Sequence, residues 1–172
     1  MFVVGVAAAV WGFWWEPSSL TKRQEELALP AWPAACDGLT VAVLADLHVG
    51  SPYNGLDKLD QIVQQTLALA PDVILMAGDY VIQGVVGGEF VAPEDAAKVL
   101  ARLKAPLGVF AVLGNHDWWL DAPRVRDALI GVDIVVLEDA SQMLDRGDCR
   151  FALVGISDYW EGAHDLKKAF KD

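Results

Sequence analysis

Three short polar motifs follow three consecutive apolar runs of the sequence, and each motif contains side chains that bind metal ions. They are Asp46-Leu47-His48, Gly78-Asp79 and Gly114-Asn115-His116-Asp117. Carboxylate, imidazole and amide groups suit divalent ions such as manganese, iron and zinc. Each motif alone is typical of a loop, a turn or a helix start. Their joint occurrence behind three apolar runs favours one shared metal site.

The residue types suit two divalent ions that lie close together. Two ions about 3.5–4 Å apart repel each other and need a shared anion, which a carboxylate with two oxygens provides. Neutral imidazoles and an amide oxygen complete the coordination without excess charge. Such ions lower the pKa of water to about 7 in favourable sites and offset charge on phosphoryl oxygens. Gly78 and Gly114 precede the polar residues, where we expect the backbone to turn sharply.

The apolar pattern around the motifs predicts a mostly parallel sheet with helices. Short apolar runs indicate buried strands, and apolar residues at helical spacing indicate amphipathic helices. Strands are expected at 39–44, 73–77, 107–113 and 132–137, helices at 57–70, 93–104, 122–130 and 162–170, and a hairpin around 146–148. Because ligands bind beyond the carboxyl ends of parallel strands, all three motifs are expected at the same edge of the sheet.

The ordered set of motifs resembles the signature of the calcineurin-like metallophosphoesterases. The surrounding sequence resembles a branch of membrane-associated phosphodiesterases related to UDP-2,3-diacylglucosamine hydrolase-like enzymes. The supporting segments are the apolar N-terminus and residues 44–48, 115–119 and 153–158. The resemblance covers residues 38 to about 165. It implies an α/β fold, a four-layer α/β/β/α sandwich of which this chain is roughly the N-terminal half.

The resemblance implies a ligand set for two divalent ions, which would be manganese, iron or zinc. Asp46 and His48 would bind the first ion, and Asn115 would bind the second. Asp79 would bridge the two. The implied activity is metal-dependent hydrolysis of a phosphoester, either a phosphodiester or a lipid-linked phosphoester.

The third motif carries the implied catalytic residues. His116 would not bind metal but would donate a proton to the leaving oxygen. Asp117 would orient His116 by accepting a hydrogen bond from its other ring nitrogen. The next residues, Trp118 and Trp119, are either core packing or the apolar wall of a lipid-facing pocket, and we expect packing for at least one of them.

The histidine content departs from the family pattern. Family members carry a later lone histidine and then a Gly-His-x-His motif, and these complete both metal sites. The remaining histidine here is His164, which we interpret as an exposed polar residue at the start of a helix. We therefore expect an incomplete site without appreciable hydrolysis in the chain as written. The alternative function is an inactive domain that keeps the metallophosphoesterase fold.

Composition limits the class of protein. The chain has 172 residues, of which 54% are hydrophobic and 22% charged, so it is long enough for one domain with a sizeable core. The formal net charge of −11 argues against nucleic-acid binding, and we interpret it mainly as a source of solubility. Cys36 and Cys149 form no CxxC pair, so the sequence predicts neither a disulfide scaffold nor a zinc knuckle.

The N-terminal residues 1–15 are apolar and uncharged, with three tryptophans toward their far end. Aromatic residues favour the membrane–water boundary, so we expect a single membrane anchor or signal anchor, with a buried apolar arm as the alternative. Lys22 and Arg23 behind it favour a cytoplasmic domain. Residues 16–37 are expected to be a linker, and 38–172 an incomplete metallophosphoesterase domain.

Overall fold

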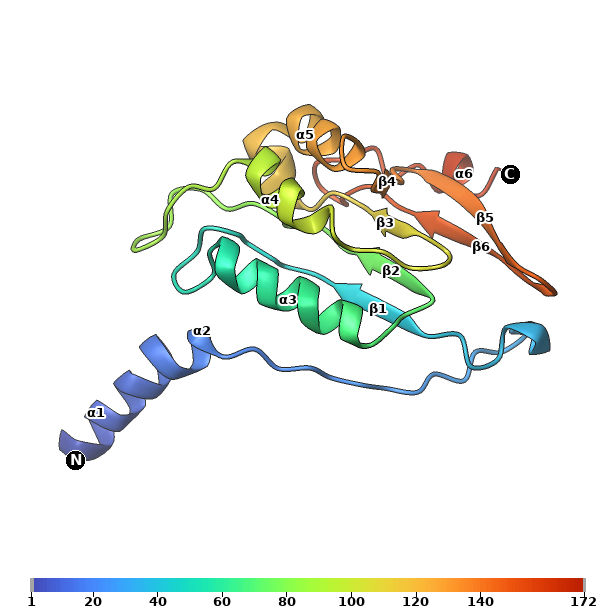
Figure 1. Cartoon of the computed structure of the whole chain (residues 1–172). Coiled ribbons are helices and arrows are strands. Elements are labelled where there is room, and N and C mark those ends of the chain that lie inside the picture. The colour runs from blue at the N-terminus through green and yellow to red at the C-terminus, as the bar shows by residue number, and fades with distance from the viewer. Residues whose placement is uncertain (1, 172) are drawn as a thin grey trace.

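The computed structural model describes residues 2–171, in which helices cover one face of a parallel sheet (Figure 1). The strands are β1 (Val41–Leu44), β2 (Val73–Met76), β3 (Val109–Ala111) and β4 (Val135–Val136), and they lie in the order β1-β2-β3-β4. The connecting helices are α3 (Leu56–Ala68), α4 (Pro93–Leu100) and α5 (Asn115–Ile130). All three strand pairs are parallel, so the expected α/β class is confirmed.

The main core lies between the sheet and its three helices. Leu59 and Val63 of α3 and Leu100 of α4 are almost fully buried, and they pack in one cluster with Ile74 and Met76 of β2. Burying each such side chain contributes about 1.5–3 kcal/mol. These contacts fix the helices relative to the strands and hold the strand ends in place.

A hairpin lies against the other face of the sheet. Its strands, β5 (Ala140–Arg146) and β6 (Cys149–Gly155), pair antiparallel around the turn that the sequence predicts. Leu144 of β5 packs with Val73 and Phe110 of the main sheet. Helices, parallel sheet and hairpin therefore form three layers among the described residues.

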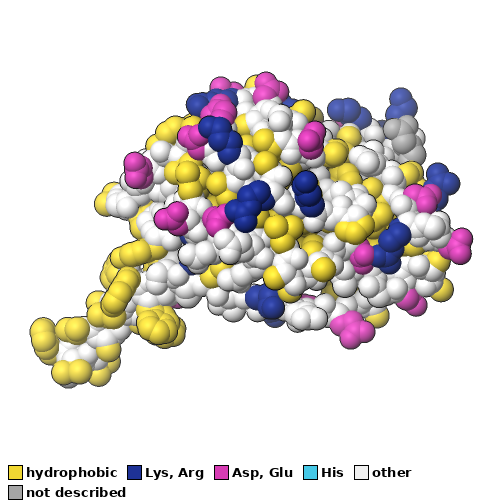
Figure 2. Space-filling view, in the orientation of Figure 1, with side chains coloured by type: hydrophobic (Ala, Val, Ile, Leu, Met, Phe, Trp, Pro, Cys, Tyr) yellow, Lys and Arg dark blue, Asp and Glu magenta, His cyan; other side chains and the backbone are white. Residues whose placement is uncertain are grey.

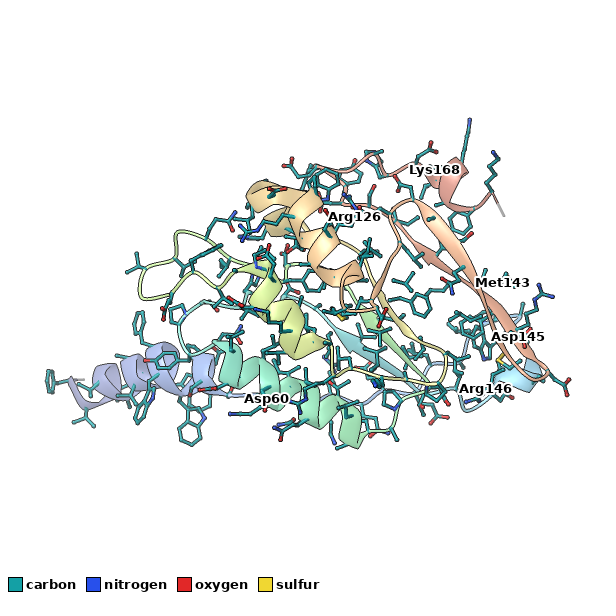
Figure 3. All side chains as sticks on the ribbon, turned by 45° about the horizontal axis from the view of Figure 1, so that its top comes forward. Asp60, Arg126, Met143, Asp145, Arg146 and Lys168 are labelled. Carbon is teal, nitrogen blue, oxygen red and sulfur yellow. A yellow bond between two sulfur atoms is a disulfide. The ribbon has the colours of Figure 1, made fainter. Side chains whose placement is uncertain are left out.

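A partly buried carboxylate, that of Asp72, fastens the hairpin tip to the sheet. Figure 3 labels Arg146 at this tip, and its guanidinium pairs with Asp72 just before β2. The backbone N–H and the hydroxyl of Thr40 donate to the same carboxylate, at 2.9 and 3.0 Å. The Thr40 N–H, followed by the Thr40 hydroxyl and Arg146, lowers the pKa of Asp72. The starts of β1 and β2 are thus held beside the hairpin.

Helix α5 begins seven residues before the helix that the apolar spacing predicts. The predicted helix, 122–130, matches only the second part of α5. Asp121 has a non-helical backbone (φ −178°, ψ 89°), and its carboxylate accepts the N–H of Arg124. Pro123 follows within the next turn, so the element consists of two helical pieces joined at a kink. The first piece carries the third polar motif. The last helix, α6 (Leu166–Ala169), is shorter than expected.

The N-terminal helical segment comprises α1 (Phe2–Val10), the π-helical η1 (Trp11–Trp15) and α2 (Glu16–Ser18). The expectation of a single membrane anchor is wrong: among residues 2–171, no helix is both long and apolar enough to span a membrane. The expected cytoplasmic side rested on that anchor and loses its support with it. These 17 residues reach about 25 Å at helical rise, less than the roughly 30 Å of a bilayer core. The buried-arm alternative is wrong as well, because Phe2 and Phe13 are 84% and 81% exposed. Figure 2 shows this apolar segment projecting from the body.

A disulfide joins Cys36 to Cys149, although the sequence predicted no disulfide scaffold. Cys36 ends the short 3-10 helix η2 (Ala34–Cys36), and Cys149 begins β6. Trp32 packs against Phe151 with ring centroids 5.2 Å apart and donates to the Cys36 carbonyl at 3.1 Å. Residues 16–37 were expected to be a linker, and the last part of this segment contacts the hairpin. A separation of 113 residues gives no local sequence signal for this bond.

Breaking the disulfide is expected to destabilise the fold. The bond closes a loop of 113 residues, so its loss should lower the free energy of unfolding by about 4.8 kcal/mol, mainly by freeing the unfolded chain. The measurement is urea unfolding of the oxidised protein and of the Cys36→Ser/Cys149→Ser double variant. Dithiothreitol should reproduce the loss in the wild type and leave the double variant unchanged. Equal midpoints with and without dithiothreitol in the wild type would contradict the bond.

Candidate metal centre

The three polar motifs lie at one edge of the sheet, beyond the carboxyl ends of β1, β2 and β3. The backbone continues to pair past the strand ends, because Asp46 N–H donates to the Gly78 carbonyl at 3.2 Å. His48 N–H likewise donates to the Asp79 carbonyl at 2.8 Å. This pairing sets the first two motifs side by side, as the parallel order of the strands requires.

The side chains of His48, Asp79 and His116 converge, with potential metal-binding atoms all within 4.8 Å of one another. His48 Nε2 lies 3.7 Å from Asp46 Oδ1 and 3.7 Å from Asp79 Oδ2. At that separation neither contact is a hydrogen bond. The His48 and His116 rings meet edge to face, with centroids 4.7 Å apart. The expected convergence of the three motifs is therefore present.

Three of the motif residues have left-handed backbone conformations. The φ angles of Asp46, His48 and Asp79 are 53°, 38° and 58°. Non-glycine residues in such conformations cost about 1–3 kcal/mol each and persist only where the surrounding structure holds them. Such residues concentrate at binding and catalytic sites, which agrees with a functional role for this edge of the sheet.

Gly78 and Gly114 allow the second and third motifs to touch. Gly78 has a φ of +97°, and a Cβ atom there would lie 2.5 Å from the Gly114 nitrogen. A Cβ on Gly114 would lie 2.2 Å from Asp79 Oδ1. Gly78 thus makes the sharp turn that the sequence predicts, whereas Gly114 is needed because its backbone approaches Asp79 closely.

Asp117 does not orient His116 as expected. Its carboxylate is fully buried and accepts backbone N–H groups from Asp79 (2.8 Å), Tyr80 (2.9 Å) and Gly114 (2.9 Å), with a longer contact from Val81 (3.3 Å). Among the described residues, Nδ1 of His116 has no hydrogen-bond partner. Burial raises the pKa of Asp117 to about 6, although the N–H donors act to lower it. Asp117 therefore fastens the second motif to the third.

The donor set fits divalent metal ions. Nδ1 of His48 and Nδ1 of His116 are buried without hydrogen-bond partners among the described residues, and buried imidazole nitrogens usually have one. The Asp46 side chain is 72% exposed beside them. Asn115 is the first residue of α5 and partly buried. Oxygen and imidazole ligands of this kind suit manganese, iron or zinc.

Two residues that support the site were not identified from the sequence. Asn54 donates through its side-chain amide to the carbonyls of Leu47 and His48, and so holds the loop that carries the first motif. The hydroxyl of Tyr80 donates to the carbonyls of Met76 and Val112 at 3.1 and 2.8 Å. A polar loop residue and an aromatic residue after a strand are too common to be singled out by sequence alone.

The two tryptophans after the third motif have different environments. Trp118 is partly buried and packs against the main core. Trp119 is 57% exposed, and its ring centroid lies 4.8 Å from that of His116. The expectation of packing for at least one tryptophan is therefore confirmed.

His164 is exposed and lies against Tyr159, with ring centroids 5.1 Å apart.

The chain is similar in sequence to known phosphoesterases. A family described as Calcineurin-like phosphoesterase matches residues 39–163. The chain is similar to the UDP-2,3-diacylglucosamine pyrophosphatase LpxG of Chlamydia trachomatis, with 34% identity over 63% of this chain and 32% of the relative. It is similar to the Phosphodiesterase YaeI of Escherichia coli, with 31% identity over 71% of this chain and 44% of the relative. A transmembrane protein with metallophosphoesterase domain from Danio rerio is 32% identical over 55% of this chain and 20% of its own length. The chain thus spans less than half the length of these relatives.

Substitution of the buried carboxylate tests its structural role. Asp117→Asn replaces one acceptor oxygen with an amide group that faces backbone N–H donors, so we expect a loss of about 3 kcal/mol in the free energy of unfolding without added metal. The measurement is urea unfolding in the presence of EDTA. Asp127→Asn makes the same charge change at an exposed position of α5 and should stay within about 0.5 kcal/mol of the wild type. Equal stability of both variants would rule out the fastening role.

Proposed function

Because the chain belongs to the calcineurin-like phosphoesterase family, whose members use divalent metals, we propose that its three motifs form a binuclear site for phosphoester hydrolysis. The observation that carries this proposal is the convergence of His48, Asp79 and His116 at the carboxyl ends of the strands. Bound divalent ions would supply an activated water as nucleophile and offset charge on the phosphoryl oxygens. Manganese, iron and zinc all suit the donors.

We assign the metal ligands by combining the site with the family pattern. Asp46 and His48 hold the first ion, and Asn115 holds the second. Asp79 bridges them, and its central position supports this role: its Oδ2 faces His48 while its Oδ1 accepts the His116 N–H at 3.0 Å. That backbone contact fixes where the Asp79 carboxylate points.

We assign proton donation to His116. Its backbone is held by Asp79, and its ring lies between those of His48 and Trp119, so the imidazole stays at the site. A protonated imidazole there donates to the departing oxygen as the phosphorus–oxygen bond breaks, which is the usual role of a general acid. Asp117 contributes by holding the two loops together, not by contact with the imidazole.

The substrate proposed for the site is a phosphodiester or a lipid-linked phosphoester. Two relatives are named as a phosphodiesterase and as a pyrophosphatase of a diacylated sugar nucleotide, which supports both classes.

A metal-binding domain without turnover is the second candidate function. The observation that favours it is the ligand count, because the cluster found among residues 2–171 contains His48, Asp79 and His116, and only the first two are assigned as ligands. With Asp46 and Asn115 added, few protein ligands serve two ions. Metal uptake without hydrolysis would distinguish this candidate from the enzyme.

Metal titration and hydrolysis of bis(p-nitrophenyl) phosphate test the assignments together. Asp79→Asn should weaken zinc binding by more than about 100-fold relative to the wild type. This loss should exceed that of Asp46→Asn, because Asp79 is assigned to both ions. His116→Ala should leave zinc binding nearly unchanged and, in a version of the protein with a complete set of metal ligands, lower turnover by about 10²–10⁴-fold. Calorimetry gives the zinc affinities, and nitrophenolate release gives the rates.

Asp145→Asn is the matched control for these variants. Figure 3 labels Asp145 at the hairpin tip, and the side chain is exposed, so both metal binding and turnover should be unaffected. Zinc affinity that falls as far in His116→Ala as in Asp79→Asn would make His116 a ligand and remove it as the proton donor.

A further inference from the structure

Trp119 places an exposed aromatic surface directly beside the candidate proton donor. The centroid of its ring lies 4.8 Å from that of His116, and the two rings are inclined at 59°. The side chain is nevertheless 57% exposed. An exposed indole this close to the candidate proton donor is within reach of the organic group of a substrate bound at the metal centre.

The indole is held in place by a hydrogen bond. Trp119 Nε1 donates to Glu161 Oε1 at 2.9 Å, and Glu161 lies 42 residues further along the chain. The hydrogen bond uses the N–H group at the edge of the indole, so the apolar faces of the ring remain available for contact with a ligand. Fixing the ring before a ligand arrives lowers the entropy that binding must overcome.

The loop that supplies Glu161 is held by several hydrogen bonds. The Asp158 carboxylate accepts the N–H groups of Trp160 and Glu161, both at 2.9 Å. At the base of the loop, the buried Ser157 hydroxyl donates to Asp139 at 2.9 Å. Gly162 permits this tight path, because a Cβ there would lie 2.5 Å from the Ser157 Cβ. Glu161 is therefore a fixed anchor for the indole.

We propose that Trp119 forms an apolar wall beside the metal centre and selects phosphoesters whose organic group presents a flat or apolar face next to His116. This inference rests on the proposed function, because it places the phosphoryl group at the metal centre. Glu161 is a positioning residue that acts through Trp119. The substrate class is thus an aryl or otherwise apolar phosphoester, in preference to one with a small hydrophilic group.

The experiment compares two phosphonates that differ only in their organic group. Calorimetry measures the binding of phenylphosphonate and methylphosphonate to the zinc-loaded full chain, so no turnover is needed. The wild type should bind phenylphosphonate about tenfold more tightly, from stacking and apolar contact with the indole. Trp119→Ala should reduce this ratio to near one, whereas Trp119→Phe should keep most of it. Glu161→Ala, which frees the indole, should reduce it to about threefold.

Phe170→Ala is the control, since it removes an exposed aromatic ring near the C-terminal end and should keep the tenfold ratio. A ratio that survives in Trp119→Ala, or equal affinities in the wild type, would overturn the proposed wall while leaving the metal site intact. If neither phosphonate binds the zinc-loaded wild type, the proposed function itself fails, and the inference falls with it. Zinc affinity and circular dichroism of each variant show that a changed ratio does not come from loss of the fold.

Discussion

One buried carboxylate, that of Asp117, holds the candidate site together. It accepts N–H groups from Asp79 and Tyr80 on one loop and from Gly114 on another, so two segments far apart in sequence share a single anchor. Desolvating a carboxylate is costly, and the cost is offset only because several backbone donors point at the same two oxygens. Asp79 lies on the first of these segments, and His116 lies in the first turn of α5 just after Gly114, so their separation depends on this contact.

Other unusual features of the site follow from bringing the loops so close. Gly114 has no side chain because the Asp79 carboxylate occupies the space a Cβ would take. Asp46, His48 and Asp79 have left-handed backbones because each must turn its side chain toward a common centre directly after a strand. The sheet and helices provide the rigid support that keeps such conformations populated. The packed core therefore stabilises the strained backbone conformations at the edge of the sheet where the motifs lie.

Much of this arrangement could be predicted from the sequence. The apolar runs predicted the parallel sheet, and the strand order then required the motifs of Asp46, Asp79 and Asn115 to lie at one edge. The role of Asp117 could not be predicted, because a carboxylate after histidine resembles a catalytic pair, and only the fold shows which donors reach it. Trp119 could not be told from Trp118, because the helix predicted from the sequence began only at residue 122 and so assigned neither of them to a helix face. The disulfide and the short N-terminal helix depend on long-range packing and on helix length, neither of which local composition determines.

The disulfide has a consequence for how the polypeptide is connected. Residues between Cys36 and Cys149 form a covalently closed ring, and every candidate metal ligand, together with His116 and Trp119, lies inside it. A single peptide cut within this ring, for example beside the 96% exposed Val86, would leave both pieces joined through sulfur. The ring closes only where thiols can be oxidised, and a strongly reducing compartment would keep it open. Resistance of the metal centre to proteolytic nicking is thereby coupled to the redox state of its surroundings.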